Sequence, residues 1–440
     1  MSGARLWPRR PGFPACPPSS STISSRPLAL KDLNMSQENK LLVLGGAGAM
    51  GRVAIKTLLG TRTFGSITIA DRALEAARQF AYELGDPRVK VIGLDVNDAA
   101  DLDAALQGAD VVISTVGPYY RFGTIVLKAA ITNRTHYLDI CDDWQPTVDL
   151  LALDDEARAA GITAIIGAGA SPGISNLLAV KAAAELDRVD TLHTVWGTGK
   201  RSADDDVAEN SAVLHHFLAM LIGHIRVHRE GALVDVRPLQ RLRIDYPGIG
   251  RVPVHTIGHP EPISLPRHFP TLRHSVNAMD MPRGIISVLR SMTRRIEEKS
   301  IPFDDAVAYL GKVFAQSDTL GFGAALKEAA RFTWGAGVEI ITRKKYLPML
   351  SAYAEGTLHG QRVRVGVSMR GEIPGGMASA TCIPTAIMAE MLMAGEVDRR
   401  GAFAPEAGVD PDRFFRRLTP FTTMPALEGS LLRTVRAEAV

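Results

Sequence analysis

Three glycines near the start of the chain limit its possible fold more than any other feature. Gly46, Gly48 and Gly51 have the spacing G-x-G-x-x-G, directly after the apolar run Leu41–Gly45 and before a helical stretch, Ala49–Leu59. The first glycine allows a tight turn, the second lets the backbone approach a pyrophosphate, and the third lets the helix lie close to the strand. Phosphate groups bind at the positive N-terminus of such a helix. The segment therefore predicts the opening of a Rossmann domain that binds a dinucleotide.

A carboxylate follows the next expected strand, Ser66–Ala70. Asp71 lies twenty residues beyond Gly51, where a carboxylate accepts hydrogen bonds from an adenosine ribose. The negative charge of Asp71 repels a 2′-phosphate, which favours NAD as the cofactor. Arg72 can instead pair with that phosphate or stack on adenine, so NADP remains possible.

Apolar runs and helical patterns alternate from Leu41 onward at the spacing of parallel βαβ units. This alternation predicts the α/β fold class, with a doubly wound parallel sheet in a Rossmann domain over residues 36–170. The six expected strands are Leu41–Gly45, Ser66–Ala70, Val89–Leu94, Asp110–Val116, His136–Ile140 and Thr163–Gly167. Helical stretches between them include Ala73–Leu84, Leu102–Gln107 and Val148–Ala160.

The ends of the later strands supply the rest of the expected nucleotide site. Asp95 follows the third strand near the adenine position, but an aspartate there is equally suited to capping a helix. The turn around Ser171 has N–H groups that suit a carboxylate or the cofactor amide, with a simple helix cap as the alternative. On this basis, the further expected cofactor contacts are Ala49, Met50, Asp95, Val96, Val116, Gly117, Pro118, Ser171 and Pro172.

The pattern changes after Gly169 and predicts a second, α+β domain over residues 171–380. It begins with the expected helix Pro172–Leu186 and contains a largely helical insertion near residues 285–333. Its strand-like runs are Thr191–Gly197, Gln240–Tyr246, Gly337–Thr342 and Val363–Arg370.

Two segments of this domain, Tyr246–Val254 and His259–Pro270, are rich in Pro and Gly and are expected to be loops. The last part of the chain, residues 381–440, contains the helix Pro384–Ala394 and a tail. This helix is apolar almost all round, so we expect it to return to the Rossmann domain and be buried there.

Composition excludes several classes of protein. The net charge is only +3 and no Lys/Arg cluster forms a stripe, so nucleic acid is not an expected partner. Cys16, Cys141 and Cys382 have no paired spacing, which indicates a reducing, cytoplasmic compartment without disulfides or a zinc site. The apolar runs are shorter than the ~20 residues of a membrane span. We expect a soluble protein that does not contact a membrane.

The first 35 residues form a separate segment. They are rich in Pro, Ser and Arg, and the first acidic residue is Asp32. This composition predicts a disordered leader and is also compatible with a mitochondrial transit peptide, although no amphipathic period is present. A translation start at Met35 is the other interpretation.

Several motifs in a fixed order resemble the saccharopine dehydrogenase family, and within it the lysine 6-dehydrogenase-like branch. They are GGAGAMG at the first turn, G-P-Y-Y-x-x-F-G at Gly117–Gly123, H-Y-L-D at His136–Asp139, G-A-S-P-G-I-S-N at Gly169–Asn176, T-x-x-P-T-A-I-M-A-E-M-L-x-x-G-E-V at Thr381–Val397 and G-A-F-A-P-E at Gly401–Glu406. The resemblance implies an NAD(P)-dependent dehydrogenase acting on CH–NH groups of an amine or amino acid, or the reverse imine reduction. It also implies a second domain that covers the cofactor and mediates homodimer formation.

Hydride transfer at such a carbon requires groups that hold a cationic nitrogen and move one proton. Asp139 and Asp142, at the end of the fifth strand, are the first candidates, with helix capping as the alternative. Tyr119 and Tyr120 follow Pro118 near the nicotinamide position, where one of them can donate to substrate.

Three further residues are expected to contact substrate. Glu261 suits an amino group and Arg267 a carboxylate, although both also suit a solvated Pro-rich loop. Asn176 follows the turn around Ser171. No metal is predicted, because the neighbouring His215 and His216 point in different directions on a helix.

Two other functions remain open. The chain is also compatible with a catalytically inactive NAD(P)-binding regulatory protein that has kept the fold. An enoyl-reductase-like member of the same family is the second alternative, and it should have a broad apolar cavity and a membrane-facing surface.

Overall fold

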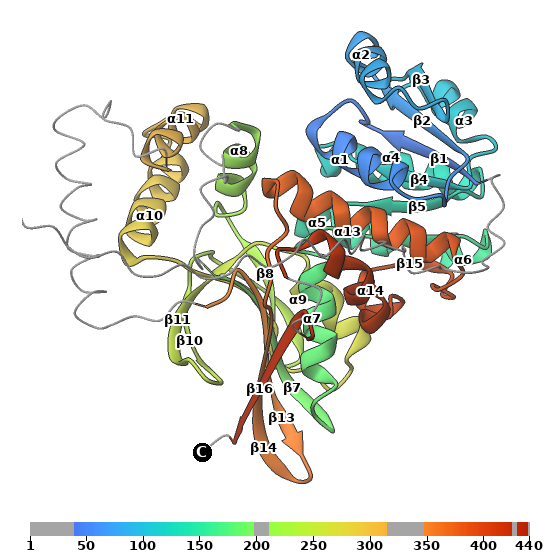
Figure 1. Cartoon of the computed structure of the whole chain (residues 1–440). Helices are drawn as coiled ribbons and strands as arrows, with labels where there is room; N and C mark the ends of the chain where they lie inside the picture. Colours follow the sequence, from blue (N-terminus) through green and yellow to red (C-terminus); the bar gives the residue numbers. More distant parts are fainter. Residues whose placement is uncertain (1–38, 198–210, 315–346, 425–428, 439–440) are drawn as a thin grey trace, which may run out of the picture. The chain divides into compact units, whose positions relative to one another are not determined.

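The computed structural model of the chain describes residues 39–197, 211–314, 347–424 and 429–438. Two seven-stranded sheets organise these residues (Figure 1). The N-terminal leader, the expected strand Gly337–Thr342 and the last part of the predicted helical insertion lie outside the described residues.

The first sheet is of the Rossmann type and confirms the predicted fold class. Its order is β15-β6-β5-β4-β1-β2-β3, and every neighbouring pair is parallel. The seventh strand was not predicted: the GAFAPE segment returns to the sheet edge, where Gly401 pairs with Thr163 and Phe403 with Ile165. The strands are β1 Lys40–Leu44, β2 Ser66–Asp71, β3 Val89–Gly93, β4 Val111–Ser114, β5 His136–Asp139, β6 Thr163–Ile165 and β15 Gly401–Phe403.

Both faces of this sheet are covered. Side chains alternate along β1, so Leu41 and Val43 belong to one apolar cluster, and Leu42 and Leu44 to another. A parallel sheet with two buried faces needs such continuous apolar strands. The helices connecting the strands are α1 Ala49–Leu59, α2 Leu74–Leu84, α3 Ala99–Leu106, α4 Tyr119–Thr132, α5 Trp144–Leu151 and α6 Asp154–Ala159.

The second sheet is mixed, in the order β10-β11-β12-β7-β13-β14-β16. Only the pair β7 and β12 is parallel among its described neighbours. A two-stranded hairpin of β8 and β9 accompanies it. The strands are β7 Arg188–Gly197, β8 Ile225–Arg229, β9 Ala232–Val236, β10 Arg241–Tyr246, β11 Gly250–Ile257, β12 Asn277–Asp280, β13 Leu350–Leu358, β14 Gln361–Met369 and β16 Leu432–Glu438.

Two predicted loops are regular elements instead. The segment expected as loop Tyr246–Val254 contains most of β11, in which Pro253 lies opposite Arg243. The segment His259–Pro270 contains helix α9, Glu261–His268, whose Pro262 lies in the first turn, where a helix does not need the missing N–H. The expected tail also contributes β16, which pairs along β14.

A buried helical layer joins the two sheets. It consists of α7 Ile174–Ala183, α13 Gly376–Met393 and α14 Pro411–Leu418. One apolar cluster contains residues of these helices, of β1 and of the second-sheet strands β13 and β14. By length and composition α13 could cross a membrane, but half of it is buried and it packs against α1. Its apolar composition is therefore explained by its place in the core.

Three helices form a smaller cluster beside β11 and β12. They are α8 Ser211–Ala219, α10 Arg283–Glu297 and α11 Phe303–Phe314, the last two within the predicted helical insertion. Buried leucines of all three, Leu218, Leu289 and Leu310, share one core with Ile257 and Met279. This packing fixes α8, which contributes to the site described next.

Candidate functional site

The turn between β1 and α1 has the geometry that the glycine pattern predicts. A Cβ added to Gly51 would lie 2.5 Å from the Gly45 carbonyl oxygen and from Gly46 Cα, so only glycine allows this helix–strand approach. At Gly48 the nearest atom to an added Cβ is 3.2 Å away, and the residue is exposed. Gly48 is the N-cap of α1 and offers no side-chain cap, which leaves the first N–H groups, at Ala49 and Met50, for a ligand.

Asp71 stabilises this turn directly. Its Oδ2 accepts the Ala47 N–H at 3.0 Å and its Oδ1 the Ala73 N–H at 2.9 Å. Arg72, the next residue, is exposed. A pyrophosphate on the Gly48 turn and a ribose near Asp71 therefore fit the residues present, with Arg72 beside them.

The adenine side differs from the prediction at one residue. Asp95 does not cap a helix: it accepts hydrogen bonds from the backbone and side chain of Asn97, while Asp98 caps α3. The Asn97 hydrogen bonds, with the charges of Arg72 and Arg121, lower the pKa of Asp95. Val96 is buried in the core.

Beyond β4 the backbone is open on one side. Val116 is half-buried, Gly117 and Pro118 are exposed, and no atom lies within 4 Å of a Cβ added at Gly117. Tyr120 in the first turn of α4 is 77% exposed and free to contact a ligand. Tyr119 does not fit its predicted catalytic role, because its buried hydroxyl donates to the Ser114 carbonyl and accepts the Ile140 N–H.

Asp139 is also a structural residue, contrary to its predicted catalytic role. It is fully buried; Oδ1 accepts the N–H groups of Gly167 (2.7 Å) and Cys141 (3.1 Å), and Oδ2 accepts the Tyr137 hydroxyl (2.8 Å). Burial raises the pKa of Asp139 to about 6, against the effect of these hydrogen bonds. This carboxyl group links the ends of β5 and β6, and both of its oxygens are occupied by protein donors.

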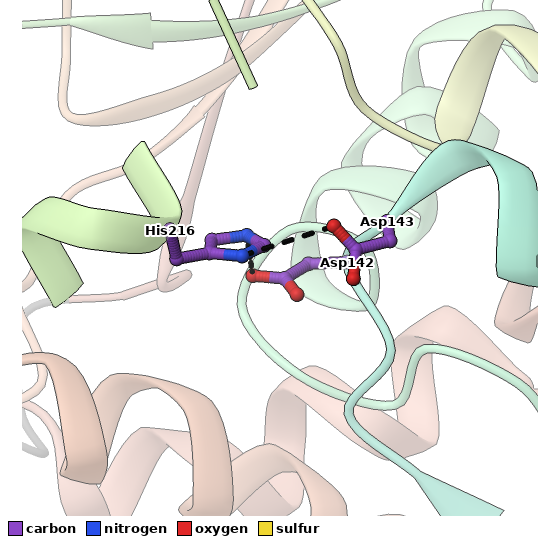
Figure 2. A group of neighbouring side chains, drawn as sticks. All are labelled: Asp142, Asp143 and His216. Atoms are coloured by element: carbon purple, nitrogen blue, oxygen red, sulfur yellow. Dashed lines mark ion pairs between the residues drawn. The ribbon is translucent and has the colours of Figure 1, made fainter. Parts of the chain in front are cut away.

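The next carboxylates face a histidine from α8 (Figure 2). Nε2 of His216 lies 2.9 Å from an Asp142 oxygen, and its Nδ1 lies 3.8 Å from an Asp143 oxygen. Burial alone would lower the pKa of His216, but the two carboxylates outweigh it and raise the pKa to about 9. Burial raises the pKa of Asp142, but the His216 imidazole outweighs burial, and the pKa is lowered. An imidazolium–carboxylate pair thus lies at the carboxyl end of β5.

The sequence analysis missed His216 and Asp143. Asp143 is the N-cap residue of α5, but its side chain makes no cap hydrogen bond. Burial and the neighbouring Asp142 raise the pKa of Asp143. Potential metal ligands of Asp142, Asp143 and His216 lie within 4.8 Å of one another. The expectation of no metal stays a prediction.

A second buried carboxylate lies at the start of α9. Oε1 of Glu261 accepts hydrogen bonds from Ser175 (2.7 Å), from Asn277 on β12 (2.9 Å) and from Ser171. The Trp196 indole at the end of β7 donates to Ser171 Oγ at 2.8 Å. Ser171 therefore contacts Glu261 and Trp196, and its predicted contact with the cofactor is not supported by these bonds.

His259 completes this arrangement. It is fully buried, its Nδ1 lies 3.4 Å from Glu261 Oε2, and its ring packs edge-on against Trp196. Neither ring nitrogen has a hydrogen-bond partner in the described part of the chain. Burial raises the pKa of Glu261, but the interaction with His259 outweighs burial, and the net shift is downward. For Asp142, burial and His216 have the largest effects on the pKa, and His259 makes a smaller contribution that lowers it. The HPEP motif was the available signal, but it indicated Glu261 and not His259.

Three predicted contacts lie elsewhere. Asn176 is buried, donates to Glu406 (2.7 Å) and Ser264 (3.2 Å) and accepts the Gly173 N–H, so its amide is fully used by the protein. Pro172 is buried over Gly167. Arg267 is exposed at the end of α9 and donates to the Leu151 carbonyl at 3.4 Å, without a described contact to Glu261.

A Rossmann turn that fits a dinucleotide, with proton-carrying groups at the carboxyl ends of β5 and β6, defines an NAD(P)-dependent oxidoreductase. Residues 41–165 match the family model described as the saccharopine dehydrogenase NADP binding domain. Over these residues the chain is similar to the NADP binding domain of the saccharopine dehydrogenase family. The resemblance that the motifs indicated is confirmed at this level, while the lysine 6-dehydrogenase-like branch stays a prediction.

The similarity to one relative extends along most of the chain. Carboxyaminopropylagmatine dehydrogenase of Synechocystis sp. is 25% identical over 395 residues, covering 86% of this chain and 94% of that protein. Saccharopine dehydrogenase [NADP(+), L-glutamate-forming] of Saccharomyces cerevisiae is 36% identical over 149 residues, covering 34% of this chain and 31% of that protein. The structure of apo saccharopine dehydrogenase (L-Glu forming) from the same yeast matches with a TM-score of 0.59 and 18% identity, over 91% of this chain and 100% of that one, and so shares the fold.

Proposed function

We propose that this chain transfers hydride between NAD(P) and the carbon of a C–N bond, oxidising a secondary amine to an imine or reducing the imine. The observation that carries the proposal is the buried pair of His259 and Glu261, which faces the carboxyl end of the Rossmann sheet together with Asp142 and His216. A bound nicotinamide supplies the hydride chemistry. The side chains of the site must then hold a cationic nitrogen and move one proton.

Glu261 is suited to hold the nitrogen. Three donors occupy its Oε1, whereas Oε2 has no hydrogen-bond partner among the described residues. His259 keeps the carboxylate ionised by lowering its pKa against the effect of burial. Oε2 faces His259 at 3.4 Å and has room to accept an ammonium or iminium N–H, which it attracts strongly because water does not screen the charges.

His259 is suited to move the proton. Its Nε2 has no hydrogen-bond partner among the described residues and its Nδ1 lies 3.4 Å from Glu261, and imidazole exchanges protons near neutral pH. In imine reduction it would deliver a proton toward the nitrogen, and in amine oxidation it would remove one. His216 has a different role: its raised pKa keeps it positive at neutral pH, so it balances the charge of Asp142.

The charge of the site indicates the substrate class. Asp142, Asp143 and Glu261 place three carboxylates around two histidines, which favours a substrate with more than one positive nitrogen. The relatives named for carboxyaminopropylagmatine and saccharopine support a carboxylated secondary amine of this kind. We propose a product of an amino aldehyde or keto acid joined to a di- or polyamine or amino acid.

For the cofactor, two observations favour NADP over the NAD preference derived from Asp71. Both Asp71 oxygens accept backbone N–H groups, and Arg72 is exposed beside them. The yeast relative carries NADP(+) in its name.

The proposal further includes a cytoplasmic homodimer, in which the second sheet takes part in substrate binding and dimerisation. Light scattering of the purified chain measures the oligomeric state.

The deciding experiment measures reduced nicotinamide by absorbance, with NADH or NADPH and pairs of amine and carbonyl compound, and with NAD or NADP and the corresponding secondary amines. We expect turnover that falls strongly in His259→Gln and Glu261→Gln and is retained in His268→Gln, an exposed histidine at the end of α9. Cofactor binding without turnover on any pair would favour the inactive regulatory protein. Turnover of an enoyl substrate alone would favour the enoyl reductase.

A further inference from the structure

Apart from this site, the structure contains an arginine-lined hollow in the second sheet region. It has a volume of about 410 Å³ and lies between α10 and the strands β10 and β11. The two strands lie side by side in Figure 1. This volume is within the usual range of small-molecule pockets, which is roughly 300–1,000 Å³. None of the described residues that line it belongs to the His259 and Glu261 site.

The basic side chains come from two directions. On α10, Arg283, Arg290 and Arg294 are spaced seven and four residues apart, so they lie along one face of the helix. The opposite face of α10 buries Leu289 and Met292 in the core, which fixes the orientation of the helix. From the sheet, Arg241 at the start of β10 faces the same hollow.

The lining has no matching negative charge. Among the described residues that line the hollow there is no Asp or Glu, while two serines, Ser287 and Ser291, add hydroxyl donors. Arg241 and Arg294 have no ion-pair partner in the described part of the chain, and Arg290 donates to the Leu239 carbonyl at 2.8 Å. The four arginines are exposed, and together they give the hollow a positive charge that attracts an anion.

We propose that this hollow binds a small organic or inorganic polyanion, with two or more carboxylate or phosphate groups. The planar guanidinium fork binds both groups in a bidentate manner, and the hollow offers such groups from both α10 and β10. A ligand with a single negative charge engages only one side. The site is independent of the proposed hydride transfer, so the two proposals can fail separately.

The test uses isothermal titration calorimetry on the full chain with saturating NADPH, so that the nucleotide site is occupied. Citrate and pyrophosphate are the probes for the carboxylate and phosphate classes, and acetate at equal ionic strength is the monoanion reference. We expect saturable binding of citrate, pyrophosphate or both, and weak or no binding of acetate. The stronger of the two probes identifies the ligand class.

The variants decide whether the hollow is the binding site. Arg241→Gln and Arg294→Gln should each weaken binding by about 10-fold or more, which is the usual scale for a bidentate charged contact. Arg295→Gln, the exposed neighbour on α10 that does not line the hollow, is the matched control and should bind as the wild type does. NADPH affinity should be equal in all three variants. No saturable binding of either probe, or equal loss in Arg294→Gln and Arg295→Gln, would overturn the proposal.

Discussion

Nε2 of His216 on α8 lies 2.9 Å from a carboxylate oxygen of Asp142 in the loop after β5. This pair joins an element beside the second sheet to the carboxyl edge of the first, at the place where the nicotinamide end of a dinucleotide is expected (Figure 2). The imidazole is positive at neutral pH because the carboxylates raise its pKa to about 9 against the effect of burial. The charge state of this pair therefore affects both stability and substrate binding.

The pair makes stability depend on pH. Because the pKa of His216 is raised from 6.5 to about 9 on folding, its stabilising contribution is complete below pH 6.5 and is lost as the pH rises through 9. We expect the unfolding midpoint of the wild type to fall over this interval more than that of His216→Gln. Chemical denaturation at a series of pH values measures the difference. His215→Gln, on the adjacent position and in an exposed pair with Asp304, is the control and should behave as the wild type does.

A second prediction separates structural from catalytic aspartates. Asp139→Ala leaves the Gly167 and Cys141 N–H groups and the Tyr137 hydroxyl without their buried acceptor. We expect a loss of roughly 2–5 kcal/mol in the free energy of unfolding, measured by urea denaturation. Asp142→Asn should instead lose activity by about 100-fold or more, and its loss of stability should disappear as the pH rises through 9, where His216 is no longer positive. The assignment is wrong if Asp139→Ala folds with wild-type stability and only its turnover falls.

Substituting alanine for Gly51 or for Gly48 in the first turn should have different effects. An added Cβ at Gly51 meets backbone atoms at 2.5 Å, so Gly51→Ala should destabilise the fold itself. At Gly48 the nearest atom is 3.2 Å away, so Gly48→Ala should keep nearly wild-type stability but bind the cofactor about 10-fold more weakly, because the methyl group enters the space of the pyrophosphate. Thermal unfolding and fluorescence titration with NADPH measure the two effects. Equal stability of the two variants would contradict this interpretation.

Local patterns predicted the parts of this molecule that are built locally. The turn at Gly46, Gly48 and Gly51 and the helix after it depend on steric rules within a few residues, and the structure has helix α1 with the predicted bounds. β15 has only three residues, too few for a period, and is a strand because it completes the edge beside β6. No local signal marks such a strand.

The site was harder to predict for a physical reason. Asp139 and Asp142 both follow β5, and sequence position alone does not show which side chain turns inward to the Gly167 N–H and which faces α8. His216 reaches the site through the packing of α8, and His259 from the residues just before α9. Site residues that lie within a sequence motif could therefore be predicted, whereas residues that only tertiary packing brings to the site could not.

The last prediction concerns the choice between NADP and NAD. Arg72 is exposed directly after β2, next to an Asp71 whose two oxygens already accept backbone N–H groups, so its guanidinium is placed to pair with a 2′-phosphate. Arg72→Ala should weaken NADPH binding by about 10-fold or more and leave NADH binding nearly unchanged, since NADH lacks that phosphate. Arg78→Ala, an exposed arginine on α2 that pairs with Glu75, is the matched control and should change neither affinity. Wild-type protein that binds NADH more tightly than NADPH, with no effect of Arg72→Ala on either, would restore the NAD preference first derived from Asp71.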